Sequence, residues 1–217
     1  DQFRALTTSQ VNSLIANHLA SLDASNLAVL NSTQIQAITP DGIAALTTQA
    51  IFSLTSDQIT YFSSRQVAAL KTTQLAAMEA IDLKALSSRQ IGALNALQLN
   101  SLSSTQMSQL LTTQVSALTL LQVPKLTSVN LNALTTSQFQ ALTTAQIAIL
   151  STSQIANLEN SDLASLDTNQ ILAITPKNIG LISTQGIVAL MTAQVRALNA
   201  NQLKTLTSNQ LSNLAVD

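Results

Sequence analysis

The residues of this sequence that could do chemistry are few, and most of them are acidic. Two pairs of carboxylates lie three residues apart, Glu79 with Asp82 and Glu159 with Asp162. This spacing could hold a hard cation or serve as an acid–base pair. It also suits the first turn of a helix, where the dipole favours negative charge. We expect the helix role, and we predict no catalytic, cofactor-binding or metal-binding residue.

The overall composition excludes several classes of function. The 217 residues include no cysteine, which excludes disulfides and thiolate sites, and one histidine, His18. His18 has no neighbouring nucleophile or carboxylate cluster, so it carries no mechanism. Charged residues make up 9% of the chain and the net charge is −1, which argues against nucleic acid as a partner. No apolar run reaches the ~20 residues of a membrane span, so we expect no membrane insertion.

An eight-residue repeat runs through the whole sequence without insertion or deletion. Counted from residue 7, the first octad reads TTSQVNSL, and 26 octads follow one another up to Leu214. Positions five and eight of every octad are apolar, and none of them is charged. A single long helix would rotate this apolar stripe by ~80° per octad, so no one face could be buried. The spacings of three and five also exclude a strand.

The octad instead predicts one short helix per repeat. The first position is usually Ser, Thr, Asp or Asn, and the fourth is Gln in 18 of 27 copies, which makes a capping box. Pro40 and Pro176 fall at the second position, the first residue of a helix, where proline is tolerated. We predict an all-α solenoid of about 26 very short capped helices, forming a single domain over 1–217. Positions five and eight should face inward, and positions three and six outward.

Three departures from the octad leave alternatives open. Residues 23–54 resemble 159–190 at an offset of 17 octads, which indicates either duplication of a longer unit or chance. Pro124 lies at the sixth position and should shorten or kink its helix. Tyr61 and Phe62 could form a ligand notch, but we favour local repacking of the core.

The whole chain resembles the octapeptide LTTxQIxAL arrays of very large bacterial surface proteins, and all 26 octads fit that pattern. The resemblance implies an exported bacterial protein, located outside the cell or on its surface. It further implies an adhesive, filament or surface-layer role. It transfers no active-site residue.

We therefore expect a structural, non-enzymatic protein that assembles with itself head to tail into a filament or surface layer. The ends keep the ordinary apolar pattern, so the expected assembly surfaces contain Phe3, Leu6, Leu211 and Leu214. The chain also starts at the third position of an octad, as though cut from a longer array. The alternative is a rod-like stalk or binding module of a larger adhesin, in contact with a cell surface or glycan. Ice or surface binding by rows of threonine is a further alternative.

Overall fold

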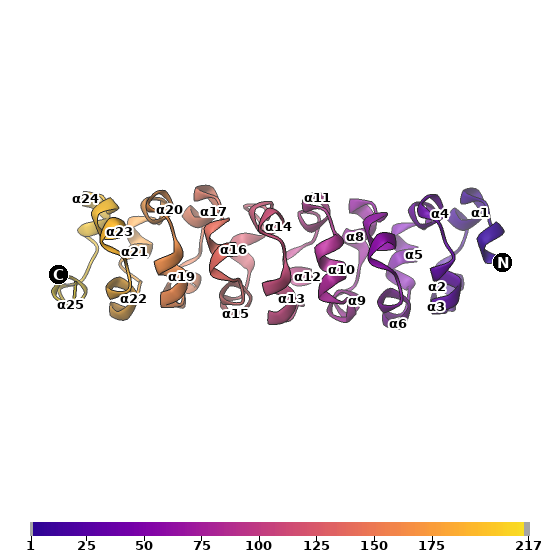
Figure 1. The fold of residues 1–217 in the computed structure, drawn as a ribbon, viewed down its shortest axis with the longest axis horizontal. Coiled ribbons are helices and arrows are strands. Elements are labelled where there is room, and N and C mark those ends of the chain that lie inside the picture. The colour runs from indigo at the N-terminus through magenta and orange to yellow at the C-terminus, as the bar shows by residue number, and fades with distance from the viewer. Residues whose placement is uncertain (1, 215–217) are drawn as a thin grey trace. The chain divides into compact units, whose positions relative to one another are not determined.

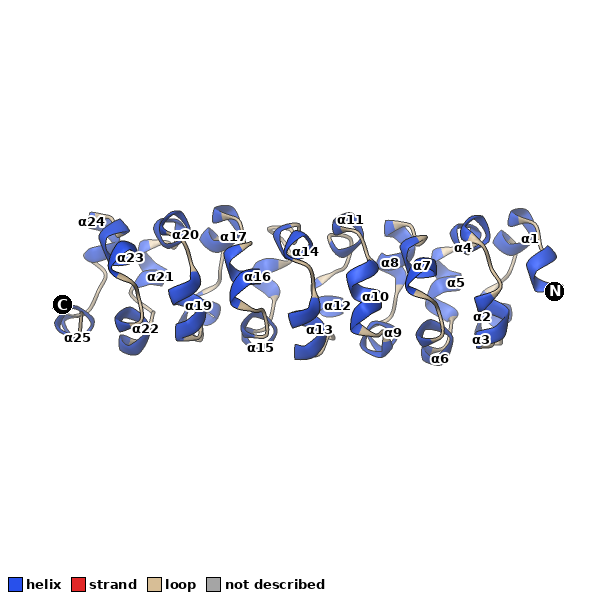
Figure 2. Ribbon diagram, viewed as in Figure 1, coloured by secondary structure: helices blue, strands red, loops and turns tan. Residues whose placement is uncertain are grey.

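A computed structural model describes residues 2–214, and over this range the chain is helical, with 25 α-helices, two 3₁₀ helices and no strand (Figure 2). The prediction of an all-α fold is confirmed. None of the helices within the described range has the length and apolar character needed to cross a membrane.

The chain forms two compact units, Asp1–Ala117 and Leu118–Asp217. The single domain expected over 1–217 stays a prediction. The helices of the first unit are η1 (Phe3–Ala5), α1 (Thr8–Asn12), α2 (Ala16–Ala20), α3 (Ala24–Ala28), α4 (Ser32–Ala37), α5 (Pro40–Ala45), α6 (Thr48–Phe52), α7 (Ser56–Thr60), α8 (Ser64–Ala69), α9 (Thr72–Ala77), α10 (Ala80–Ala85), α11 (Ser88–Ile91), α12 (Ala96–Asn100), α13 (Ser104–Gln109) and α14 (Thr112–Ser116).

The helices of the second unit are η2 (Val123–Lys125), α15 (Ser128–Asn132), α16 (Thr136–Gln140), α17 (Thr144–Ala148), α18 (Thr152–Ala156), α19 (Asn160–Ser165), α20 (Thr168–Ala173), α21 (Pro176–Ile179), α22 (Thr184–Val188), α23 (Thr192–Ala197), α24 (Ala200–Leu203) and α25 (Ser208–Ser212).

Most of the α-helices begin at the capping box that the sequence predicts. In α8 the hydroxyl of Ser63 accepts the backbone N–H of Gln66, and the Gln66 side chain accepts the backbone N–H of Ser63. Pro40 and Pro176 are the first residues of α5 and α21, after the capping residues Thr39 and Thr175. Helices of four to six residues are too short to be stable alone in water, so packing must maintain them.

Packing takes place between helices that are three octads apart. In the first unit α1 lies against α4, α2 against α5 and α3 against α6, and Figure 1 shows α1 beside α4 and α3 beside α6. In the second unit α16 lies against α19, and α19 against α22. One turn of the solenoid therefore contains three octads, or 24 residues. The sequence did not predict this number.

The fifth and eighth positions of the octad form the core, as expected. Ile59 and Phe62, for example, occupy these positions in one octad and are 0% and 4% exposed. Phe62 is thus a core residue, which agrees with repacking rather than a ligand notch, and Tyr61 beside it is half-buried.

The expected count of about 26 short helices is confirmed, and one octad differs from the others in its helix type. The octad at 119–126 forms the 3₁₀ helix η2 in place of an α-helix, so 25 of the 26 octads are α-helical. Pro124 lies within η2. Because proline has no backbone N–H, it cannot donate the hydrogen bond that an α-helix needs at this position. The predicted disruption at Pro124 is confirmed.

Candidate functional site

Gln66, at the fourth position of its octad, joins two successive turns of the first unit. Its Oε1 accepts the backbone N–H of Ser63 at 2.7 Å, which caps α8. Its Nε2 donates to the carbonyl oxygens of Ile35 and Ile38 in the preceding turn, both at 2.8 Å. Gln66 is only 1% exposed. One buried side chain therefore caps its own helix and also holds that helix to the previous turn.

This contact, which we call the inter-turn clamp, recurs through both units. In every copy the amide nitrogen donates to the carbonyl oxygen of the residue 28 positions earlier, the eighth residue of an octad. The glutamines that make it are Gln34, Gln58, Gln66, Gln74, Gln90, Gln98, Gln106 and Gln114 in the first unit, and Gln146, Gln154, Gln170, Gln194, Gln202 and Gln210 in the second.

The clamp solves a problem at the ends of the helices. The last carbonyl groups of a helix lack partners within it, and proteins often close such ends with a left-handed residue. No residue within 2–214 has a positive φ angle. The amides of the next turn instead supply hydrogen bonds to carbonyl groups at and beyond the helix ends, which explains why a solenoid of such short helices can bury its backbone.

Sequence reasoning found the cap but missed the clamp. A capping box accepts Glu as readily as Gln at the fourth position, because only an acceptor oxygen is needed there. Yet none of the 27 fourth positions is Glu. Only the amide of Gln or Asn keeps N–H groups to donate at any pH. The absence of Glu was the signal that these side chains also act as donors.

The non-glutamine residues at the fourth position adapt in different ways. Asn178 keeps the clamp, since its Nδ2 donates to the carbonyl oxygen of Leu150 at 2.8 Å. Gly42 and Gly186 have no side chain that could make it. A Cβ atom at Gly186 would lie 2.9 Å from Cδ1 of Leu163, and one at Gly42 would overlap Cδ1 of Leu19. At these two places an apolar side chain of the preceding turn fills the space of the amide.

Asp82 is the first of the two acidic residues in the clamp position. It lies at the third residue of α10 and is 3% exposed. Its Oδ1 accepts a hydrogen bond of 2.8 Å from the hydroxyl of Ser56, in the preceding turn. Its expected partner Glu79 is the exposed N-cap residue of the same helix and makes no side-chain cap. Asp82 therefore reaches the preceding turn as an acceptor.

Asp162 is the second, and its surroundings differ. It is 3% exposed in the first turn of α19, and its Oδ2 is buried without a hydrogen-bond partner. Burial, with the nearby charge of Glu159, raises the pKa of Asp162 from its ordinary value of 3.8 to about 7. Glu159 itself is exposed at the N-cap. The first-turn placement agrees with our expectation, but the burial of Asp162 goes beyond a role at an exposed helix end.

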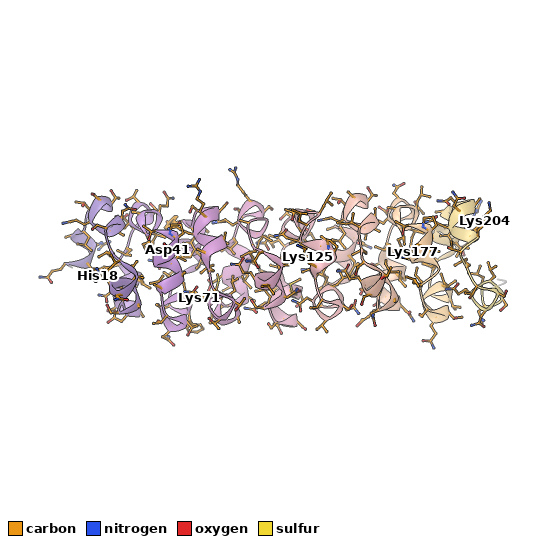
Figure 3. All side chains as sticks on the ribbon, turned by 180° about the vertical axis from the view of Figure 1, so that it is seen from behind. His18, Asp41, Lys71, Lys125, Lys177 and Lys204 are labelled. Atoms are coloured by element: carbon orange, nitrogen blue, oxygen red, sulfur yellow. The ribbon has the colours of Figure 1, made fainter. Side chains whose placement is uncertain are left out.

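The remaining candidates do not gather into a site. His18 is exposed at the third residue of α2. Figure 3 labels it together with Asp41 and Lys71, and the three lie apart on different octads of the first unit. Within residues 2–214 no group of three or more His, Cys, Asp or Glu side chains could hold a metal ion.

The expected assembly residues lie at the two ends of the described chain. Phe3 and Leu6 are half-buried in and just after η1. Leu211 is 45% exposed in α25, and Leu214 is half-buried. A hollow of about 200 Å³ lies beside Leu214. These residues occupy fifth and eighth positions, whose counterparts in the interior are buried.

The two similar segments place their unusual residues in equivalent roles. Gln49 and Gln185 are both exposed at the third position of their octads. The residues that follow them, Ala50 and Gly186, are both buried and both donate their backbone N–H to the capping hydroxyl at 3.0 Å. Duplication of a longer unit stays a prediction.

Comparison with known protein families finds a match to a short sequence repeat. Three segments match the ALTTAQ repeat. They are residues 41–72, 75–112 and 123–160. The name can be read directly at 141–146, which spell Ala-Leu-Thr-Thr-Ala-Gln and contain the capping Thr143 and the clamping Gln146. No curated protein matches the chain. The resemblance to an octapeptide repeat is thus supported at the level of the repeat.

Proposed function

We propose that this chain is a structural, non-enzymatic repeat protein that assembles end to end with copies of itself. The observation that carries the proposal is the polarity of the inter-turn clamp. Within each unit a turn donates side-chain amides to the turn before it and offers carbonyl oxygens to the turn after it. The two faces of a turn are therefore complementary but different. Contacts between unlike faces run on as open filaments unless the rotation closes a ring.

The outermost described turns present these two faces. Gln10, a fourth-position glutamine, is exposed in the first turn. In the last turn Leu203 and Leu211 are 38% and 45% exposed, whereas Leu131 at the same octad position is 0% exposed. Covering such apolar surface with a further turn would be favourable. A second copy, seated head to tail, would supply amides for one face and carbonyl oxygens for the other.

The alternative is a stalk within a longer adhesin. Additional octads of the same chain would cover both faces in the same register, so the clamp supports this arrangement as well. For either arrangement we propose a location at the bacterial cell surface, which is supported by the resemblance to octapeptide arrays of large surface proteins.

Light scattering across protein concentration tests the proposal. We expect the average mass of the chain to rise with concentration. Gln10→Glu places a carboxylate where an amide should donate, and Leu211→Glu places a charge on the apolar end. Each variant should stay monomeric under conditions in which the parent chain associates. The matched control is Gln36→Glu, which changes an exposed glutamine at the sixth position of its octad, in α4, and should associate like the parent.

Mixing the two end variants makes the test specific for head-to-tail contact. Each variant keeps one intact face, so the mixture should form dimers that neither variant forms alone. If the parent chain stays monomeric at every concentration and the end variants change nothing, self-assembly is wrong, and the stalk takes its place. If the variants associate as the parent does, the contact lies on another surface.

A further inference from the structure

Glutamine and Asn178 fill the clamp position with a side-chain donor, which an ionised Asp162 could not supply. Every amide clamp described above donates to a carbonyl oxygen 28 residues earlier. For residue 162 that oxygen belongs to Leu134, directly before the N-cap of α16. An ionised carboxylate has no proton to donate, so its oxygen and the carbonyl oxygen of Leu134 would both be acceptors, with no hydrogen between them.

Asn178 shows that a side chain of this length reaches the carbonyl. Asparagine and protonated aspartic acid have nearly the same shape, and Nδ2 of Asn178 lies 2.8 Å from the carbonyl oxygen of Leu150, 28 residues earlier. Both side chains start from the same place in their helices, the third residue. The matching bond from Asp162 would run from its Oδ2, the atom that is buried without a partner.

Within α19 and the described helices α16 and α22 packed against it, no positive charge is available to hold the carboxylate of Asp162 ionised. On α19 the only other charged group is Glu159, which is exposed and repels a second negative charge. The two helices packed against α19 are α16 and α22, and neither contains a charged residue. Asp167, in the next octad, is exposed and accepts the backbone N–H of Gln170 at 2.7 Å.

We propose that Asp162 is a pH-sensitive clamp, which closes the contact between its octad and the preceding turn only while its carboxyl group keeps its proton. In the neutral form Oδ2–H donates to the carbonyl oxygen of Leu134, as the amides do elsewhere. When the proton leaves to solvent, the buried carboxylate loses this bond and faces the carbonyl group. The contact between α16 and α19 then loosens, and the turn within the second unit opens.

The direction of the pH effect follows from the raised pKa. In the unfolded chain Asp162 titrates near 3.8, and in the folded chain near 7. The folded chain therefore binds more protons between these values, and stability must fall as the pH rises through this interval. The contribution is complete below about pH 4 and is lost above about pH 7. This is the reverse of the usual behaviour of an aspartate in an ion pair.

The direct test is a ¹³C NMR titration of the full chain that follows the side-chain carboxyl carbon of Asp162. We expect its midpoint to lie near pH 7, well above the ordinary aspartate value of 3.8. Asp162→Asn, which restores an amide donor, should melt at a higher temperature than the parent chain at pH 8, and this advantage should shrink as the pH falls to 5. Glu159→Gln should lower the midpoint of Asp162 while leaving the clamp in place.

The reciprocal variant is Asn178→Asp, which should create a second clamp of the same kind. It should match the parent chain at pH 4.5 and melt below it at pH 8. A midpoint for Asp162 near pH 4, or a pH-independent difference between the parent chain and Asp162→Asn, would overturn the proposal. A thermal melt with added calcium at pH 8 tests the remaining alternative, a cation site. If calcium stabilises the parent chain and not Asp162→Asn, the residue is a cation ligand and the acid clamp is wrong.

Discussion

The amide nitrogen of Gln66 lies 2.8 Å from the carbonyl oxygen of Ile38, a residue 28 positions earlier and one turn away in the solenoid. The same side chain accepts the N–H of Ser63 at the start of its own helix. A local cap and a long-range contact therefore depend on one group. Because each short helix is unstable alone, the two contacts reinforce each other: the cap orients the amide, and the amide fixes the capped helix in the stack.

Replacing this amide by a carboxylate should separate the two roles. In Gln66→Glu the side chain can still accept the N–H of Ser63, but it has no proton for the carbonyl groups of Ile35 and Ile38. A buried charge with a single backbone donor costs more than an unpaired neutral group, so we expect the free energy of unfolding to fall by about 3 kcal/mol or more. Chemical denaturation followed by circular dichroism measures the change.

Gln36→Glu is the control for this experiment, because Gln36 is exposed and should change stability by less than about 0.5 kcal/mol. Acid should rescue Gln66→Glu, since the protonated side chain regains a donor. Equal stability of the two variants at pH 8 would show that the clamp does not contribute.

Leu142 and Thr143 test the relative weight of core and cap. Leu142 is 3% exposed at an eighth position, and Leu142→Ala should cost about 2–5 kcal/mol through the cavity that it leaves. The hydroxyl of Thr143 only accepts the N–H of Gln146 at 3.2 Å, so Thr143→Ala should cost about 1 kcal/mol. Denaturation of both variants under one condition compares them. A milder effect for Leu142→Ala would mean that the inward face is wrongly assigned.

Replacing two of the glycines by alanine should change the stability of the protein in opposite directions. At Gly186 a Cβ atom would lie 2.7 Å from Cγ2 of Ile182, so Gly186→Ala should destabilise the second unit by about 1–3 kcal/mol. At Gly92 the nearest atom would be 3.4 Å away, and the φ angle of −63° suits alanine. Gly92→Ala should therefore be neutral or stabilise by about 0.4–1 kcal/mol. The melting temperatures of the two variants test both expectations. A lower melting temperature for Gly92→Ala would contradict the space that the structure shows around Gly92.

The sequence predicts everything in this fold that is local to one octad. The capping Thr and Ser residues, the prolines at helix starts and the inward Leu and Ile residues all carry their signal within eight residues. The number of octads in one turn carries no such signal. The hydrogen bonds that cap a helix form within its own octad, whichever octads pack against it. Asp162 shows the consequence: its neighbours in sequence indicate an ordinary first turn, whereas it is buried where α19 packs against α16 of the preceding turn.

The most direct measurement of the inter-turn clamp is an NMR experiment on the side-chain amide of Gln66. The account predicts nuclear Overhauser contacts from its two Nε2 protons to the backbone protons of Ile38 and Thr39, with slow exchange of these amide protons with solvent. Gln36, as an exposed glutamine, should show neither. Fast exchange at Gln66, or contacts only with residues of its own octad, would contradict the account.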